Sequence, residues 1–132
     1  SCDRVKVIEK VNVKNCTFNE IFGTETLPDS ELSEFLSMDL SFISIKKVLQ
    51  NVLNFVNKNA EMVLLIKPQF EAEKNEIQKG GVVKDTKVHK KIIEDIKNYA
   101  SSFSLETLGV TTSPIQGAKQ GNTEYLIYLR RI

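Results

Sequence analysis

The sequence EMVLLIKPQFE, residues 61–71, decides the fold of this chain. Its apolar run from Met62 to Ile66 has the length of a strand and lacks the alternation of a half-exposed strand, so we expect a central strand that is buried on both faces. Pro68 cannot donate to a sheet ladder and holds the preceding residue extended, so the strand must end with Lys67 at its tip. Open α/β sheets place working residues at such carboxyl ends. The alternative is that Lys67 is a snorkelling lysine without a chemical role.

Strand and helix patterns alternate along the rest of the chain. The sequence predicts further strands at 5–8, 34–39, 105–110 and 123–129, and amphipathic helices at 45–56, capped by Ser44, and from Asp85 to Ala100. The remaining stretches, 20–33, 71–84 and 111–122, are predicted as loops. This alternation favours an α/β fold with a mostly parallel sheet. The connection between the last two strands is too short for a parallel crossover, so we expect the last strand to be antiparallel to its neighbour.

Length and composition indicate one globular domain. The chain has 132 residues, of which 41% are hydrophobic and 27% charged, and its apolar runs fall short of the roughly 18 residues that a membrane-spanning helix needs. Cys2, Cys16 and His89 are too scattered to form a metal site, and we expect reduced thiols in a cytoplasmic protein without membrane contact. The net charge of +1 means that a nucleic-acid partner would be bound through a local patch.

Three charged residues are predicted to meet at one edge of the sheet. Asp39 and Lys67 follow parallel strands, and Glu124 lies at the beginning of an antiparallel strand that starts at the same edge. A lysine between two carboxylates can accept or orient a hydroxyl proton. The same arrangement also occurs as a purely structural ion-pair network.

The second predicted helix has a basic outer face, formed by Lys87, Lys90, Lys91 and Lys97. Such a row is usually a solvated surface, and it is also what an RNA contact requires.

Five segments together resemble the TlyA family of hemolysins and ribosomal RNA methyltransferases, which belongs with the FtsJ-like 2′-O-methyltransferases. They are DLSFIS at 39–44, KPQFE at 67–71, KGGVVKD at 79–85 with His89, SPI at 113–115 with Gly117, and GNTEYLIYLR at 121–130. The resemblance extends over nearly the whole chain. It implies a Rossmann-like, S-adenosylmethionine-dependent enzyme that methylates ribose 2′-hydroxyl groups of ribosomal RNA, in the free RNA or in ribosomal subunits.

FtsJ-like enzymes use a Lys-Asp-Lys-Glu tetrad, and the motif match implies that Asp39, Lys67 and Glu124 resemble its aspartate, second lysine and glutamate. Lys67 would activate the 2′-hydroxyl for in-line attack on the methyl group, while Asp39 and Glu124 orient the lysine. The resemblance also implies that Asn12 and Asp39 contact the cofactor. Lys87, Lys90 and Lys91 are the expected RNA-binding residues.

The family's first tetrad lysine, its glycine-rich cofactor turn and its amino-terminal RNA-binding domain precede the motifs found here. We therefore expect residues 1–132 to form one domain, the carboxyl-terminal part of an FtsJ-like methyltransferase domain, that is inactive and binds S-adenosylmethionine weakly or not at all. The strand ending at Asp39 would have an open edge, which could pair with the 5–8 strand or with a second copy in a homodimer.

Three alternatives stay open. A membrane-active hemolysin would need a membrane-inserting segment, whereas the two predicted helices are explained by packing on a sheet. A non-catalytic RNA-binding module would not need Asp39, Lys67 and Glu124. A methyltransferase of small molecules would not need the basic row.

Overall fold

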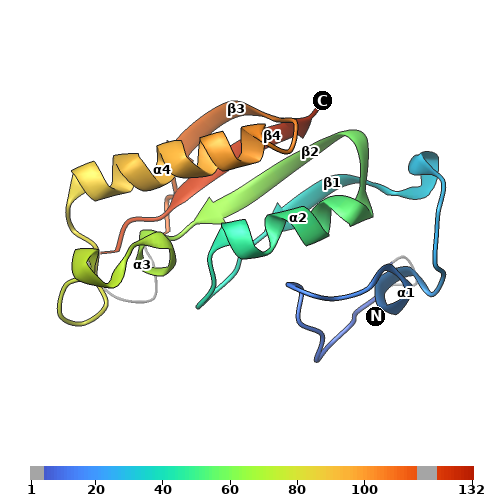
Figure 1. Ribbon diagram of the computed structural model, residues 1–132, viewed down its shortest axis with the longest axis horizontal. Helices are drawn as coiled ribbons and strands as arrows, with labels where there is room; N and C mark the ends of the chain where they lie inside the picture. The colour runs from blue at the N-terminus through green and yellow to red at the C-terminus, as the bar shows by residue number, and fades with distance from the viewer. Residues whose placement is uncertain (1–4, 116–121) are drawn as a thin grey trace.

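A four-stranded mixed sheet forms the centre of the molecule in the computed structural model, which describes residues 5–115 and 122–132. The strand order is β1-β2-β4-β3, with β1 parallel to β2 and β4 antiparallel to both β2 and β3 (Figure 1). The strands are β1 (Ser33–Met38), β2 (Val56–Ile66), β3 (Leu105–Thr112) and β4 (Tyr125–Arg131). The predicted α/β class, the parallel pairing and the antiparallel last strand are thus confirmed.

Short helices and 3-10 turns connect the strands of the described chain. They are α1 (Phe18–Phe22), η1 (Asp29–Glu31), η2 (Ile45–Lys47), α2 (Leu49–Val52), η3 (Leu53–Phe55), α3 (Pro68–Glu71), η4 (Lys74–Glu76) and the longer α4 (Thr86–Ser101). The N-cap predicted at Ser44 is present, because Ser44 accepts a hydrogen bond from the Lys46 amide. Asp85 likewise caps α4 by accepting a hydrogen bond from the Lys87 amide.

The first predicted helix is wrong in detail. Residues 45–55 form a single α-helical turn between two 3-10 turns, and Val56 begins β2 instead of ending the helix. The segment is rich in Val and Asn, whose helix propensities are low. It is held against the sheet by burial of its apolar side and by hydrogen bonds such as that from Arg131 in β4 to the Leu53 carbonyl (2.9 Å).

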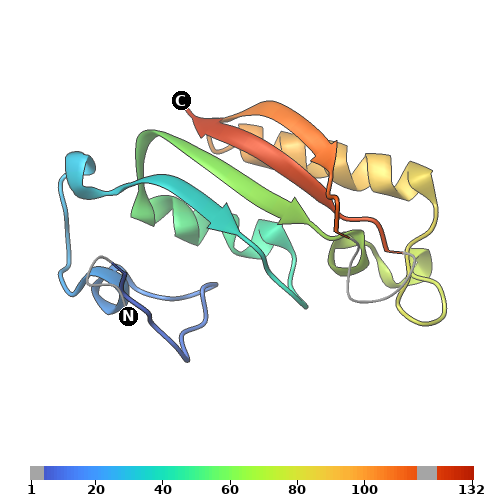
Figure 2. The same ribbon diagram turned by 180° about the vertical axis from the view of Figure 1, so that it is seen from behind.

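Helices cover only one face of the sheet in the described part of the chain. Both α2 and α4 lie in front of the strands in Figure 1, and the reverse view in Figure 2 shows the strands uncovered. Burial along β2 alternates accordingly: Met62, Leu64 and Ile66 are fully buried, whereas Val63 and Leu65 are half-buried. The prediction that this strand is buried on both faces is therefore wrong here, because an unbroken apolar sequence does not specify what covers its second face.

The amino-terminal residues do not form the predicted strand. Val5 and Val7 are exposed, and residues 5–8 pair with none of the described strands. The following segment packs instead against the α2 side, where the Asn51 side chain donates hydrogen bonds to the carbonyls of Val13 (2.9 Å) and Cys16 (3.1 Å). Within the described residues β1 pairs only with β2, so its outer edge is open, as the sequence predicted.

Candidate functional site

A cavity of about 310 Å³ opens at the carboxyl edge of the sheet. Its walls come from the loop after β1, from α3 and the loop that follows it, and from the residues before β4. The lining residues are Ser41, Phe42, Lys67, Gln69, Phe70, Ile77, Gly81, Asn122 and Glu124. Ligands of open α/β sheets bind at this edge, so the cavity is the candidate site.

Lys67 lies at the tip of β2, as predicted, and its ammonium group is tightly held. Its Nζ lies 2.6 Å from Oδ1 of Asp39 and donates a hydrogen bond to the Ser41 hydroxyl over 3.3 Å. The lysine side chain is only 12% exposed, whereas that of Asp39 is 67% exposed. Asp39 thus fixes the lysine while its own carboxylate still faces solvent.

Glu124 faces the same cavity but is held by a different partner. Its side chain is buried, and its Oε2 accepts a hydrogen bond of 2.8 Å from Nε2 of Gln69. Two of the three predicted residues, Lys67 and Glu124, therefore line the cavity, and Asp39 lies outside its lining and is joined to it through the ion pair with Lys67. Gln69 was not predicted from the sequence, although its place one residue after Pro68 in the KPQFE motif was the available signal.

Two phenylalanines form the mouth of the cavity. The rings of Phe42 and Phe70 lie 5.0 Å apart between centroids and are tilted by 49°, and Nζ of Lys67 is 6.0 Å from the Phe70 centroid. Phe42 is 88% exposed and has a positive φ of 64°. A bulky residue in this conformation is strained, and such strain is typical of functional loops. The sequence carried no signal for an exposed Phe42, since apolar residues are ordinarily assigned to the core.

Glu71 joins α3, which contains Phe70, to the segment that follows the Phe42 loop. Its carboxylate accepts hydrogen bonds from the Ser44 hydroxyl (2.5 Å) and from the Ile45 amide (2.7 Å). Burial raises the pKa of Glu71, although the same hydrogen bonds and the nearby Lys46 act to lower that pKa. The residue couples α3 to the segment that follows β1.

Asn122 holds the remaining wall of the cavity. The residue is 1% exposed, and its side chain accepts a hydrogen bond from the Val83 amide and donates one to the Gly81 carbonyl, both over 3.1 Å. Buried His89 supports the same loop, because its Nε2 lies 2.6 Å from the Val83 carbonyl. A carbonyl can only accept, so Nε2 carries the proton, and in the neutral ring Nδ1 accepts from the Tyr125 hydroxyl 2.9 Å away. Burial raises the pKa of Tyr125.

The other predicted site residues lie apart from the cavity lining. Asn12 is exposed and its side chain accepts a hydrogen bond from the Lys14 amide in a turn. Lys87, Lys90 and Lys91 are exposed on α4, and Lys91 forms an ion pair with Glu76. Within residues 5–115 and 122–132, no three metal-ligating side chains come together, and no helix is long and apolar enough to cross a membrane. The motif glycines at 117 and 121 lie outside the described residues.

Comparison with known proteins places this site in a family. The FtsJ-like methyltransferase domain matches residues 1–131. Hemolysin A of Brachyspira hyodysenteriae is 36% identical over 126 residues, which are 96% of this chain and 49% of that protein. The 16S/23S rRNA (cytidine-2′-O)-methyltransferase TlyA of Mycobacterium tuberculosis is 34% identical over 127 residues, 96% of this chain and 44% of that protein.

A solved structure has the same fold. The crystal structure of a "putative hemolysin" from Lactococcus lactis superimposes with a TM-score of 0.85 at 34% identity, covering 100% of this chain and 59% of that one. The chain thus spans about half the length of the relatives it matches. The resemblance inferred from the motifs is confirmed, and the chain belongs to the FtsJ-like methyltransferase family.

Proposed function

We propose that this chain is the catalytic, carboxyl-terminal part of a methyltransferase domain that methylates ribose 2′-hydroxyl groups of ribosomal RNA. The observation that carries the proposal is Lys67, held by Asp39 over 2.6 Å at the end of β2, in a cavity that also contains Glu124. Membership of the FtsJ-like family supports methyl transfer. The name of the Mycobacterium tuberculosis relative supports ribosomal RNA as the substrate class.

The cofactor of the proposed reaction is S-adenosylmethionine, which supplies an electrophilic methyl group when bound. The described residues fit one side of such a site, because Asp39 presents an exposed carboxylate at the carboxyl edge of the sheet. A glycine-rich turn between a strand and a helix is not found among them. Gly80 and Gly81 belong instead to a tight turn closed by the bridge between Gln78 and Val82. We infer that the complete cofactor site needs further residues, and the proposed contacts of Asn12 and Asp39 depend on them.

The residues of this chain would handle the proton of the ribose hydroxyl. In the proposed step Lys67 would react as the free amine and accept that proton while the 2′-oxygen takes the methyl group, whose bond to sulfur breaks with the electron pair left on the sulfur. The ion pair with Asp39 would then stabilise the ammonium group that forms. Glu124 adds a second negative charge across the cavity, and Gln69 fixes its direction. Lys67 is thus the proposed base, and the two carboxylates orient it.

The pair of Phe42 and Phe70 gives the cavity a surface suited to a nucleotide base. RNA-binding proteins recognise unstacked bases by stacking them on aromatic side chains, and an enzyme that modifies a nucleotide takes it out of its stack. The exposed Phe42 ring, together with the Phe70 ring that lies 6.0 Å from Nζ of Lys67, would hold the base while the ribose faces Lys67.

The test is methyl transfer from labelled S-adenosylmethionine to ribosomal subunits by a chimera. In it, this chain replaces the matching 127 residues of the Mycobacterium tuberculosis relative. We expect label in the RNA, and a loss of at least about a hundredfold for Lys67→Ala, the scale of general-base catalysis. Lys58→Ala, a change of an exposed lysine outside the cavity, is the control. Full activity of Lys67→Ala would show that Lys67 is not the base of the reaction.

Binding of RNA by the outer face of α4 is a separate part of the proposal. Lys87 and Lys90 are exposed, whereas Lys91 already has Glu76 as its partner. The double variant Lys87→Glu/Lys90→Glu should weaken RNA binding and flatten its salt dependence, because fewer counterions are released. Lys58→Glu is the matched control. If the affinity for RNA and its dependence on salt concentration do not change, this face of α4 is a solvated surface that does not bind RNA.

Both the Brachyspira hyodysenteriae relative and the Lactococcus lactis structure carry the word hemolysin in their names. The apolar sides of α2 and α4 are buried against the sheet, which supports RNA methylation over membrane insertion. If the chain causes leakage of a dye trapped in liposomes and the chimera transfers no methyl group, the membrane-active hemolysin becomes the favoured function.

A further inference from the structure

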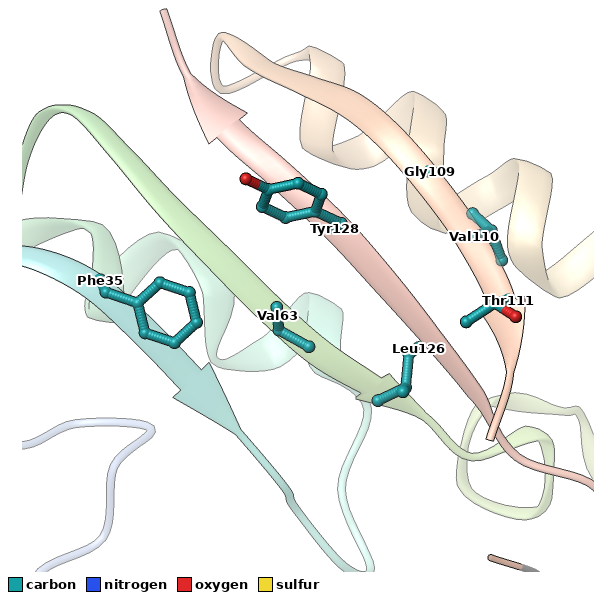
Figure 3. Close-up of a pocket in the computed structure, with 7 residues that line it drawn as sticks. All are labelled: Phe35, Val63, Gly109, Val110, Thr111, Leu126 and Tyr128. Atoms are coloured by element: carbon teal, nitrogen blue, oxygen red, sulfur yellow. The ribbon is translucent and has the colours of Figure 1, made fainter. Parts of the chain in front are cut away.

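A hollow of about 500 Å³ lies on the uncovered face of the sheet. Figure 3 shows that its lining is apolar apart from the hydroxyl groups of Thr111 and Tyr128. The cavity at the carboxyl edge is different, because Lys67 and Glu124 contribute charged groups to its lining. Proton transfer needs a positioned acid or base, so the surroundings of Lys67, rather than the apolar hollow, are where the proposed reaction can be controlled.

The nitrogen of the Lys67 side chain has two hydrogen-bond acceptors in the protein. Oδ1 of Asp39 lies 2.6 Å from Nζ, and the hydroxyl oxygen of Ser41 lies 3.3 Å from it. Both acceptors belong to the segment that follows β1, whereas Lys67 follows β2. The parallel pairing of β1 with β2 brings the two acceptors to the lysine. The contact with Asp39 was predicted from the sequence, and that with Ser41 was not.

These two acceptors determine where the lone pair of the free amine can point. The nitrogen of an amine is tetrahedral, and besides its bond to carbon it holds two hydrogens and one lone pair. When Asp39 and Ser41 accept the two N–H groups, the lone pair takes the remaining position. Among the described residues, no third acceptor bonds to Nζ, and Lys67 lines the cavity. The remaining position is therefore the one that a ligand in the cavity can reach.

With Asp39 as the only acceptor, the direction of the lone pair would be undefined. Rotation about the bond between Cε and Nζ would exchange the lone pair with the second N–H group, and an N–H group that faces a hydroxyl cannot take its proton. The bond to Ser41 removes this alternative. Its length of 3.3 Å fits the role, because catalytic hydrogen bonds are often long before the substrate binds and shorten in the complex.

We propose that Ser41 is a positioning residue for methyl transfer, whose hydroxyl oxygen accepts an N–H group of Lys67 and so directs the lone pair of the amine at the ribose 2′-hydroxyl. The inference rests on the proposed function, in which Lys67 is the base. The proton passes from the 2′-oxygen to Nζ, the 2′-oxygen bonds to the methyl carbon, and the bond from that carbon to sulfur breaks with its electron pair left on the sulfur. Ser41 keeps its own proton throughout.

The first test measures kcat and KM for ribosomal subunits in the chimera described above. We expect Ser41→Ala to lower kcat by at least about tenfold while KM stays nearly constant, because the change misdirects the base and leaves the bound RNA in place. Ser41→Thr keeps a hydroxyl group at the same place and should restore most of kcat. Ser101→Ala, at an exposed serine outside the cavity lining, is the control and should leave both constants unchanged.

The second test is the dependence of kcat on pH, which separates the direction of the lone pair from the basicity of the amine. If Ser41 acted only on how readily Lys67 releases its proton, Ser41→Ala would move the pH at which kcat rises and leave the highest kcat unchanged. A misdirected lone pair lowers kcat at every pH. We therefore expect the highest kcat of Ser41→Ala to fall by the same factor as its kcat at neutral pH.

Several results would overturn the role of Ser41 and leave the proposed function standing. They are full activity of Ser41→Ala beside an inactive Lys67→Ala, an equal loss of kcat in Ser41→Ala and Ser41→Thr, and a raised KM with unchanged kcat, which would make Ser41 a contact to RNA. A shift of the pH profile at unchanged highest kcat would limit Ser41 to basicity. If Lys67→Ala is fully active, or the unchanged chimera transfers no methyl group, the proposed function fails and the role of Ser41 fails with it.

Discussion

At the scale of single residues, Glu71 connects the wall of the cavity to the segment that leads to α2. Its carboxylate bonds to Ser44 and Ile45, which begin the segment leading to α2, while Phe70 beside it faces the cavity. Because burial is the largest influence on this carboxylate, its ionised form is less favourable in the folded chain than in the unfolded one. The hydrogen bonds from Ser44 and Ile45 to the Glu71 carboxylate, here called the clamp, are therefore sensitive to pH.

The sign of that sensitivity follows from the raised pKa of Glu71. Below the ordinary value of 4.5 the carboxyl is protonated in both the folded and the unfolded chain, and its favourable contribution is complete; the contribution decreases as pH rises through the folded-state pKa. Glu71→Gln cannot ionise and still offers an oxygen to the Ile45 amide. We expect the melting temperature of Glu71→Gln minus that of the wild type to rise by a few degrees between pH 4 and pH 7. Only the wild type loses the stability that is lost when Glu71 ionises.

Thermal melts followed by circular dichroism across this pH range measure the difference. Glu34→Gln, at an exposed position away from the Glu71 hydrogen bonds, is the control. A difference between Glu71→Gln and wild type that does not vary with pH would contradict the raised pKa.

At the scale of elements, the loop between α3 and α4 is held by side chains rather than by a sheet. Asn122 bonds to the backbone of Gly81 and Val83, and His89 adds a bond to Val83 from α4. These contacts fix the loop that supplies Gly81 to the cavity. Asn122 also lies just before Glu124 in the chain, so the loop and the beginning of β4 are coupled.

Asn122→Ala should open this loop. It leaves the buried Val83 amide without its partner, a loss of about 1–3 kcal/mol in the free energy of unfolding. We expect the Val83 amide to exchange with deuterium at least about tenfold faster while amides in the middle of α4 keep their protection. Asn98→Ala, at an exposed position on α4, is the control. Unchanged exchange at Val83 would show that His89 alone holds the loop.

At the scale of the whole molecule, the described chain has a candidate catalytic site at one edge of the sheet, and the face of the sheet opposite α2 and α4 is uncovered. Lys67, Asp39 and Glu124 would form the acceptor side of the proposed site, whereas of the two proposed cofactor contacts only Asp39 lies beside the cavity and Asn12 lies apart from it. We therefore predict that the isolated chain binds S-adenosylmethionine too weakly for calorimetry at micromolar concentrations. Saturable heat from a micromolar complex would contradict this, and the chimera titrated in parallel is the control.

The sequence by itself determined the features that depend on neighbouring residues. Pro68 ends β2 and leaves Lys67 at its tip, Asp85 caps α4, and the short last connection makes β4 antiparallel. These rules act over a few residues, so a sequence is enough to apply them. The family was likewise evident from motifs in the sequence and is confirmed by the match over residues 1–131.

Only the tertiary structure decided which groups meet and which surfaces stay open. Gln69 reaches Glu124 across 55 positions of the chain and Ser44 reaches Glu71 across 27, distances over which no local pattern in the sequence carries information. The same holds for the strand predicted at 5–8, which pairs with none of the described strands, and for β2, whose apolar residues are alike on its two faces. Burial depends on what packs against a side chain, and that is a property of the folded molecule.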